Sequence, residues 1–379
     1  MTVPFNIPLF TEDSFSNLRK MVQLSKFSGD GFFNDQVQGQ LKEITKSSHV
    51  LLTPSCTHSL ELALRVLRLE QGDEVIIPDW TFTSAVIAVL SQGANPVFVD
   101  CNLNPPNISA TQIVEAITDR TRAVIVMNYN GIGFQLQTIK SICSERDIVL
   151  IEDNAHGLGA KYKGESLGSF GTMSTYSFHE TKNFQCGEGG AITFRDEIFL
   201  NQAKNIREKG TDRSLFLDGK IEKYQWVDKG SSYLLAEPLS AILNSSLKVY
   251  DKVQSKRQVL WNSYQAAFRN NLPTHLVEIP NVESDNEHSS HIYYLILKSS
   301  DLRNDFLRFM KNNSIQAVFH YQSLSQSKGG AHYGRLAGDN TNSRLLSNGL
   351  VRLPLYYSLT RSEIEKIIEL TLNFFKDKS

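Results

Sequence analysis

The chain has 379 residues, of which 41% are hydrophobic and 21% are charged, a composition typical of a folded protein with a sizeable core. Its 39 lysine and arginine residues nearly balance its 40 aspartate and glutamate residues. Because there is no basic excess, the charge disfavours a general binder of nucleic acid or of acidic membrane surfaces.

Neither a secretory signal nor a membrane span is indicated. Residues 1–10 have no basic stretch followed by an apolar one, and no segment approaches the roughly 18 apolar residues that a membrane helix needs. The four cysteines are widely spaced and form no C-x-x-C pair, which disfavours a zinc site or a disulfide framework. We therefore expect a cytoplasmic protein with reduced thiols and no metal.

Short apolar runs alternate with helical patterns in the first half of the chain. The runs at 74–78, 96–100, 123–127, 149–153 and 174–178 predict strands, several of them continuously apolar, as in parallel strands covered on both faces. Between them, residues 57–69 predict a helix, and Ser109 with Gln112 predicts the capping box of another. This alternation predicts an α/β fold with a mostly parallel sheet.

The pattern changes after residue 233. Residues 234–268 predict one long helical stretch, 291–297 and 315–320 predict strands, and 302–310 predict a helix. A closing helix is expected after Thr360, with Glu363 as its capping-box partner. We expect two domains, with the larger sheet in residues 1–245 and a linking helix and a smaller α+β domain in residues 246–379.

A glycine pair after a predicted strand resembles the start of the dinucleotide-binding motif G-x-G-x-x-G. The pair is Gly131 and Gly133, and Leu136 occupies the place of the third glycine. A leucine there would obstruct the close packing of helix on strand that this motif needs, and the pair does not follow the first strand of the fold. The sequence therefore favours a tight turn over an NAD site.

Polar residues follow two of the predicted strands. Thr57 and His58 begin a helix whose free amides can receive a phosphate, although ordinary helix capping explains them equally well. Asp153 ends an apolar strand shortly before His156. A carboxylate at this edge can keep a pyridine nitrogen protonated, or it can simply cap the next helix.

A lysine and two aromatic residues complete this set. Lys182 follows a predicted strand and precedes the glycine-rich Gly187-Glu-Gly-Gly190, so its amine can be desolvated and act as a nucleophile; most lysines are instead solvated at the surface. Either Trp80 or Phe82 can stack on a flat cofactor, although most aromatic residues belong to the core. Together these segments supply what pyridoxal phosphate needs.

The motif Ser177-Phe-His-Glu-Thr-Lys182-Asn, with Gly187-Glu-Gly-Gly190, makes the chain similar to the DegT/StrS-type sugar aminotransferases, which are fold-type-I pyridoxal-phosphate enzymes. This resemblance implies a large, mostly parallel, seven-stranded-type α/β domain that binds pyridoxal 5'-phosphate, and a smaller α+β domain. It implies that Lys182 forms the Schiff base, that pyridoxamine 5'-phosphate links two half-reactions, and that a homodimer shares its active sites. The implied catalytic residues are Lys182, Asp153 and His156, and the implied cofactor-binding residues are Thr57, His58, Phe82 (preferred to Trp80), Asp153, His156, Ser177, Lys182 and Ser232 of the partner subunit.

The same motif is typical of 4-aminotransferases in this family, whereas many 3-aminotransferases carry Phe-Tyr-Pro before the lysine. The resemblance implies amination of dTDP-4-keto-6-deoxyglucose, with L-glutamate as donor, for lipopolysaccharide or O-antigen synthesis. A 3-aminotransferase and a non-catalytic regulatory protein on the same fold remain the alternatives. The candidate substrate contacts are Lys209 and Arg213 for the diphosphate and His320 and Tyr321 for the sugar, with surface charges and a core pair as the alternative interpretation.

Overall fold

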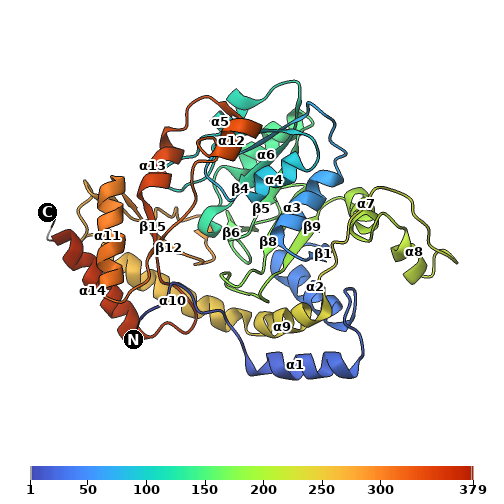
Figure 1. Cartoon of the computed structure of the whole chain (residues 1–379), viewed down its shortest axis with the longest axis horizontal. Coiled ribbons are helices and arrows are strands. Elements are labelled where there is room, and N and C mark those ends of the chain that lie inside the picture. Colours follow the sequence, from blue (N-terminus) through green and yellow to red (C-terminus); the bar gives the residue numbers. More distant parts are fainter. Residues whose placement is uncertain (1, 377, 379) are drawn as a thin grey trace.

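The computed structural model describes residues 2–376 and 378, and a mostly parallel sheet of eight strands forms its larger part (Figure 1). The five central strands run parallel to one another, while β9 runs antiparallel to both β8 and β1. The predicted fold class is therefore confirmed. In spatial order the strands are β1 (His49–Thr53), β9 (Gly190–Phe194), β8 (Met173–Ser177), β5 (Val149–Asp153), β4 (Thr121–Met127), β2 (Glu74–Pro78), β3 (Asn95–Val99) and β14 (Arg335–Ala337).

Both faces of this sheet are covered, which explains why its strands are continuously apolar. Along β2, Ile76 belongs to a core cluster with α5 and α6, whereas its neighbours Val75 and Ile77 belong to another with α3, α4 and α7. The predicted capping box of α5 is present, because the Gln112 amide donates to Ser109 Oγ over 3.3 Å and the Ser109 amide donates to Gln112 Oε1. The covering helices are α3 (Cys56–Arg65), α4 (Ser84–Leu90), α5 (Ala110–Ala116), α6 (Leu136–Glu145) and α7 (Glu197–Arg207).

A four-stranded antiparallel sheet forms the second layer of the molecule. Figure 1 shows α11 and α14 beside its strands β12 and β15. The closing helix begins where predicted, and the Thr360 amide donates to the Glu363 carboxylate over 2.8 Å. The elements are β10 (Val277–Glu278), β12 (Tyr293–Leu297), β15 (Leu350–Leu353), β13 (Val318–Phe319), α11 (Ser300–Asn312), α12 (Lys328–Tyr333), α13 (Thr341–Gly349) and α14 (Arg361–Lys376).

Two predicted elements need correction. The single helix expected over 234–268 is two helices that meet at Val249, whose φ of −104° and ψ of 22° leave the helical region. The strand expected at 315–320 is only the two residues of β13. The remaining elements are α9 (Glu237–Lys248), α10 (Tyr250–Phe268), α1 (Glu12–Gln23), α2 (Phe32–Thr45), α8 (Arg213–Leu217), a 3-10 turn (Tyr129–Gly131), and a small sheet of β11 (Asn286–Glu287), β6 (Lys161–Tyr162) and β7 (Glu165–Ser166).

The two sheets are joined by more than the connecting helices. Strand β14 comes from the later part of the chain and pairs in parallel with β3, adding an eighth strand to the expected seven. Its first residue, Arg335, donates two hydrogen bonds, of 3.0 and 3.1 Å, to the buried carboxylate of Glu74. The boundary between residues 245 and 246 stays a prediction. Strand β14 lies in the predicted smaller domain but pairs with the sheet of the larger one.

The glycine pair that resembles a dinucleotide motif lies in a tight turn. Gly131 ends the 3-10 turn with a positive φ of 70°, which favours glycine. A Cβ atom on it would lie 2.4 Å from Ser289 Oγ, so the turn packs directly against the second part of the chain. Among the residues that the structure describes, no helix is long and apolar enough to cross a membrane.

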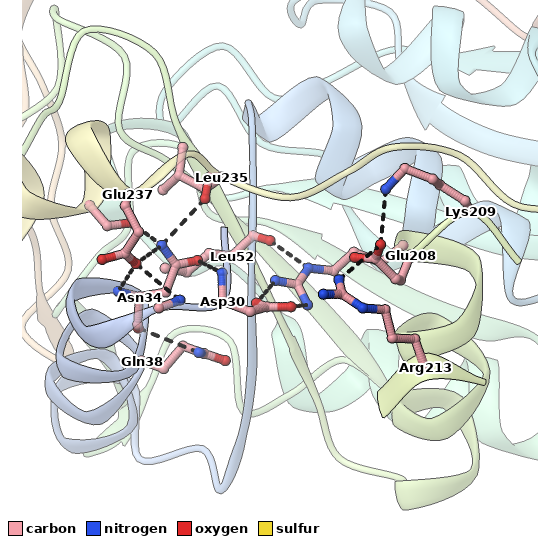
Figure 2. A network of polar contacts seen from close by, with 12 residues as sticks. Asp30, Asn34, Gln38, Leu52, Glu208, Lys209, Arg213, Leu235 and Glu237 are labelled. Atoms are coloured by element: carbon pink, nitrogen blue, oxygen red, sulfur yellow. Dashed lines mark hydrogen bonds and ion pairs between the residues drawn. The ribbon is translucent and has the colours of Figure 1, made fainter. Parts of the chain in front are cut away.

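A buried arginine, paired with the accessible carboxylate of Asp30, fixes the loop before α2 to the larger sheet (Figure 2). Arg207, at the end of α7, is 4% exposed and donates from Nε to the Leu52 carbonyl of β1 over 2.9 Å. Its two terminal nitrogens donate to the carboxylate of Asp30. Next to this pair, the Glu237 carboxylate accepts hydrogen bonds from the amides of Phe33 and Asn34. The amino-terminal helices are thereby tied to β1 and to α9.

We expect Arg207→Met to lower the free energy of unfolding by about 2 kcal/mol, because it leaves the Asp30 carboxylate and the Leu52 carbonyl without their buried donor. Urea unfolding followed by circular dichroism measures this loss. Arg361→Met is the control: it removes an exposed pair with Glu365 in α14, and we expect little change in the free energy of unfolding. Equal losses in the two variants would contradict the importance of the buried Arg207.

Candidate active site

A cavity of about 750 Å³ lies where β5 and β8 end and α3 begins, bounded on its other side by the second sheet. Parallel strands bring their carboxyl ends to one edge of the sheet, which is where such sheets bind ligands. Most of the predicted site residues line this pocket, although their roles stay predictions. Those that line it are Thr57, Phe82, Asp153, His156, Ser177, Lys182, His320 and Tyr321.

Lys182 lies in the loop after β8, where its amide donates to the His179 carbonyl over 2.9 Å. Burial lowers the pKa of the Lys182 amine from its ordinary value to about 8, although the nearby Asp153 acts in the opposite direction. With this pKa, roughly a tenth of the amine is unprotonated at pH 7. Lys182 therefore has the character of a usable nucleophile and not that of a solvated surface lysine.

Asp153 is the last residue of β5 and is 5% exposed. Burial raises the pKa of its carboxyl group, while the amide of Ala155, which donates to Oδ1 over 3.0 Å, and the nearby Lys182 lower it. A cationic ring nitrogen at hydrogen-bond distance would further favour the carboxylate. The arrangement thus suits a group that meets a protonated pyridine.

His156 is buried at the back of the pocket and is held as a neutral ring. The Asn130 amide lies 3.4 Å from Nδ1 and donates to it, so the proton of the neutral ring is on Nε2, which lies 3.4 Å from the Tyr321 hydroxyl. Burial lowers the pKa of His156 well below its ordinary value, and the positive charges of Lys182 and Arg352 lower it further. An uncharged, fixed ring is suited to contact with a flat aromatic ligand.

The aromatic residues of the pocket differ in accessibility. Phe82 is 56% exposed and lines the cavity, whereas Trp80 is buried and donates from Nε1 to the Tyr321 carbonyl over 2.9 Å. The rings of His320 and Tyr321 stack with their centroids 3.6 Å apart, and His320 Nδ1 lies 2.8 Å from the Tyr129 hydroxyl. Of the two rings considered for stacking, only Phe82 is available to a ligand.

The hydroxyl groups at the start of α3 form a polar corner of the pocket. Ser55 caps this ten-residue helix, and the Thr57 hydroxyl lies 2.6 Å from that of Ser84. Ser177, at the end of β8, lines the same cavity. Hydroxyl groups beside a helix N-terminus are a suitable donor set for a phosphate group, so the residues present fit a phosphorylated ring with Asp153 and Lys182.

The structure places four predicted residues outside this pocket. The His58 amide donates to Ser55 Oγ over 3.2 Å, as in ordinary helix capping. Lys209 and Arg213 both pair with the carboxylate of Glu208, at 2.9 and 3.4 Å, so within their own chain they behave as paired surface cations (Figure 2). Ser232 forms a β-bridge with Glu208 instead of reaching the cavity of its own chain.

The sequence analysis missed Arg352 of β15 as a site residue. Its guanidinium lies 4.6 Å from the ring centroid of Phe5 and donates from Nη2 to the Phe319 carbonyl over 3.0 Å, while its buried Nε has no partner among the described residues. Burial lowers its pKa. The sequence feature that could have identified Arg352 is a basic residue within a short run that is otherwise apolar, Leu350-Val-Arg-Leu353. Cys56, Ser84 and His291 also line the pocket and were not predicted.

No group of three or more His, Cys, Asp or Glu side chains in the described part of the chain is arranged to hold a metal ion. The functional groups that line this site are an amine of lowered pKa, a buried carboxyl group, neutral imidazoles, an arginine and a set of hydroxyl groups.

Known proteins share this fold, and some also resemble the sequence. The chain is 25% identical over 386 residues to the spore coat polysaccharide biosynthesis protein SpsC of Bacillus subtilis, covering 99% of this chain and 97% of that one. The putative sugar aminotransferase Spr1654 of Streptococcus pneumoniae, in its PLP-form, superposes with a TM-score of 0.91 at 23% identity, covering 100% and 99% of the two chains. The aminotransferase TlmJ of Streptoalloteichus hindustanus gives a TM-score of 0.91 at 21% identity, with both chains fully covered.

A family model matches almost the whole sequence. The match spans residues 8–371, and so includes the lysine loop, both sheets and the arginine of β15. The chain belongs to the DegT/DnrJ/EryC1/StrS aminotransferase family.

Proposed function

We propose that this protein is a pyridoxal-phosphate-dependent nucleotide-sugar aminotransferase. It transfers the amino group of L-glutamate to the C4 ketone of dTDP-4-keto-6-deoxyglucose, giving a dTDP-4-amino-4,6-dideoxyhexose for surface-polysaccharide synthesis. The observation that carries the proposal is one pocket holding both Lys182, whose pKa is lowered to about 8, and the buried Asp153. Spr1654, described as a putative sugar aminotransferase with PLP- and PMP-forms, and SpsC, named for polysaccharide synthesis, support the substrate class.

When bound, pyridoxal phosphate supplies an electron sink that weakens the Cα–H bond of the amino donor. The chain's own residues orient it. Thr57, Ser177 and the amides at the start of α3 receive the phosphate, Asp153 meets the pyridine nitrogen, and Phe82 and His156 contact the ring. These contacts hold the reacting carbon beside the Lys182 amine.

Lys182 has two tasks in this proposal. Its unprotonated amine would be the nucleophile that holds the cofactor, and as a free amine the same Nζ would take up and return a proton at the donor Cα. A pKa of about 8 suits both, because the amine exchanges protons readily near neutral pH. His156, which is neutral and fixed, contributes contact and not charge.

Arg352 is the anion-binding group that glutamate requires. Its guanidinium is held from one side by Phe5 and through Nη2 by the Phe319 carbonyl, which leaves Nε free of any described partner. A carboxylate of the donor would satisfy this buried donor, and such charge-assisted hydrogen bonds are the strong ones. Arg352 is therefore the proposed partner of a donor carboxylate in the half of the reaction that loads the amine.

A second copy of the chain completes the site in this proposal. Ser232 does not line the cavity of its own chain, and Figure 1 shows the nearby α8 projecting at the end of the molecule opposite α11 and α14. Trp226, close to it in sequence, is 76% exposed. Clustered exposed apolar side chains mark interaction surfaces. The exposed apolar residues of this segment are Leu215, Phe216, Leu217, Tyr224, Trp226 and Val227.

We expect purified protein to absorb visible light through bound cofactor and to keep that cofactor covalently attached after borohydride reduction. Lys182→Ala should keep none covalently attached and lose amino transfer by about 10³-fold or more. Because the free amine is the nucleophile, cofactor uptake by the apoprotein should rise with pH and level off above about 8. Lys161→Ala, which removes an exposed lysine paired with Glu287, is the control and should behave as wild type. Wild-type turnover by Lys182→Ala would refute the assignment.

The product identifies the substrate position. Incubation of the enzyme with dTDP-4-keto-6-deoxyglucose and glutamate should give a sugar whose NMR ring couplings place the new amine at C4 and report its gluco or galacto configuration. A 3-amino product from a related keto sugar would make this a 3-aminotransferase. Cofactor binding without transfer to any keto sugar would instead favour a regulatory protein on the same fold.

We expect Arg352→Gln to raise the KM for glutamate about 10- to 100-fold, because a charged hydrogen bond to a carboxylate is lost. Steady-state kinetics with the donor varied at fixed keto sugar measures this effect. Arg303→Gln, an arginine of α11 that donates to the Ser347 carbonyl, is the control and should leave the donor KM unchanged. Identical donor KM values in both variants and wild type would remove Arg352 from donor binding.

We expect the protein to be a dimer and Trp226→Asp to increase the monomer fraction and weaken cofactor affinity together, because a charge is placed on the proposed interface. Light scattering at graded protein concentration and fluorescence titration with the cofactor follow the two quantities. Val259→Asp alters an apolar residue of α10 that is 61% exposed, and serves as the control. A wild-type monomer that binds cofactor tightly would overturn the shared site.

A further inference from the structure

Residues 289–292 lead into β12. They contact both Asn183, which follows Lys182, and His156. We propose that His291 is a positioning residue that holds Asn183, the neighbour of Lys182, and the ring of His156 in a single arrangement. This inference rests on the proposed function and deepens it, because it identifies a residue that sets the geometry of the lysine and of the ring contact.

The first contact is with the residue that follows the lysine. His291 Nδ1 lies 2.9 Å from Asn183 Oδ1, and Asn183 Nδ2 donates to the Ser289 carbonyl over 2.9 Å. Since the amide nitrogen is committed to that carbonyl, Oδ1 is the acceptor and His291 donates from Nδ1. Asn183 is thus anchored at both ends of its side chain by one segment, which fixes the backbone next to Lys182.

The second contact is with His156. The rings of His291 and His156 have centroids 4.4 Å apart, and Ser289 Oγ donates to the His156 carbonyl over 2.5 Å. The same segment also holds Asn130, because the Ile292 amide donates to Asn130 Oδ1 over 3.0 Å. Asn130 in turn presents its own amide to His156 Nδ1. The orientation of the His156 ring is therefore set by the segment from two directions.

His291 acts here as a neutral ring. It is 5% exposed, and burial lowers its pKa well below the ordinary value, with the charges of Lys182, Arg257 and Arg352 and the neighbouring His156 acting in the same direction. It also lines a small cavity of about 10 Å³ that is bounded by Lys182 and Ser177. A substitution of the His291 ring therefore changes the shape of this small cavity next to Lys182.

The test compares His291→Phe with His288→Phe in protein loaded with pyridoxal phosphate. Both variants remove a buried histidine, but His288 precedes the segment, accepts from the Ser290 amide over 3.2 Å, packs on the Trp261 ring 4.3 Å away and does not line the active-site pocket. For His291→Phe we expect the midpoint of the pH titration of the visible absorbance to move by about 0.5 unit or more. We expect its kcat to fall about tenfold with little change in the KM for the keto sugar, as for other groups that orient a reacting residue.

Two further variants test the mechanism of positioning. His291→Asn places an amide donor near the position of Nδ1, so it should restore most of the absorbance midpoint that His291→Phe loses. Asn183→Ala should repeat the effect of His291→Phe, and the double variant should lose little more than either single one, because both remove the same contact. Additive losses in the double variant would overturn the link between the two residues.

His288→Phe should lower thermal stability while keeping the wild-type midpoint and kcat. If both phenylalanine variants share the wild-type midpoint and kcat, His291 has only a structural role and the inference fails, although an active wild type leaves the proposed function intact. If wild-type protein shows no cofactor absorbance and no amino transfer, the proposed function fails, and the inference fails with it.

Discussion

Lys182 and Asp153 are an amine and a carboxyl group held in the same pocket, where burial shifts the pKa of both, and each is charged in its ordinary state. Removing a charge from water is costly, and a nearby opposite charge offsets this cost only in part. For Lys182 the cost of burial outweighs the attraction of Asp153, so the pKa is lowered and the amine is partly unprotonated near neutral pH. The surrounding structure must keep these two groups buried and close together without allowing water to hydrate them.

The parallel sheet provides this placement. Strands β5 and β8 are neighbours, and their register pairs Asp153 with Thr175, two residues before β8 ends at Ser177. The chain then turns directly into the loop that carries Lys182. Asp153 is therefore fixed at the end of one strand, and Lys182 lies in the loop that follows the neighbouring strand, whose position is set by backbone hydrogen bonds.

This explains which parts of the site the sequence could predict. Asp153 ends the predicted strand 149–153, Ser177 lies in the predicted strand 174–178 and Lys182 follows it, so the local pattern indicates their place near strand ends. Their roles were implied only by the resemblance to the family. Arg352 lies in β15 of the antiparallel sheet, and His291 lies just before β12. Both reach the pocket only through tertiary packing, which the periodicity of the sequence does not indicate. The return of β14 to the larger sheet was missed for the same reason, since it depends on pairing with β3, which is distant in sequence.

The second part of the chain completes the pocket and does not merely cover it. Trp80, just beyond β2, donates to the Tyr321 carbonyl, and the buried Asp79 accepts from the Ser325 amide over 2.7 Å. These bonds fix the segment carrying His320 and Tyr321 against the larger sheet. Because the contacts are buried and directional, a shift of either sheet would leave polar groups unpaired, which is costly. The lowered amine pKa is therefore a property of both sheets together, since desolvation of Lys182 requires the second sheet in place.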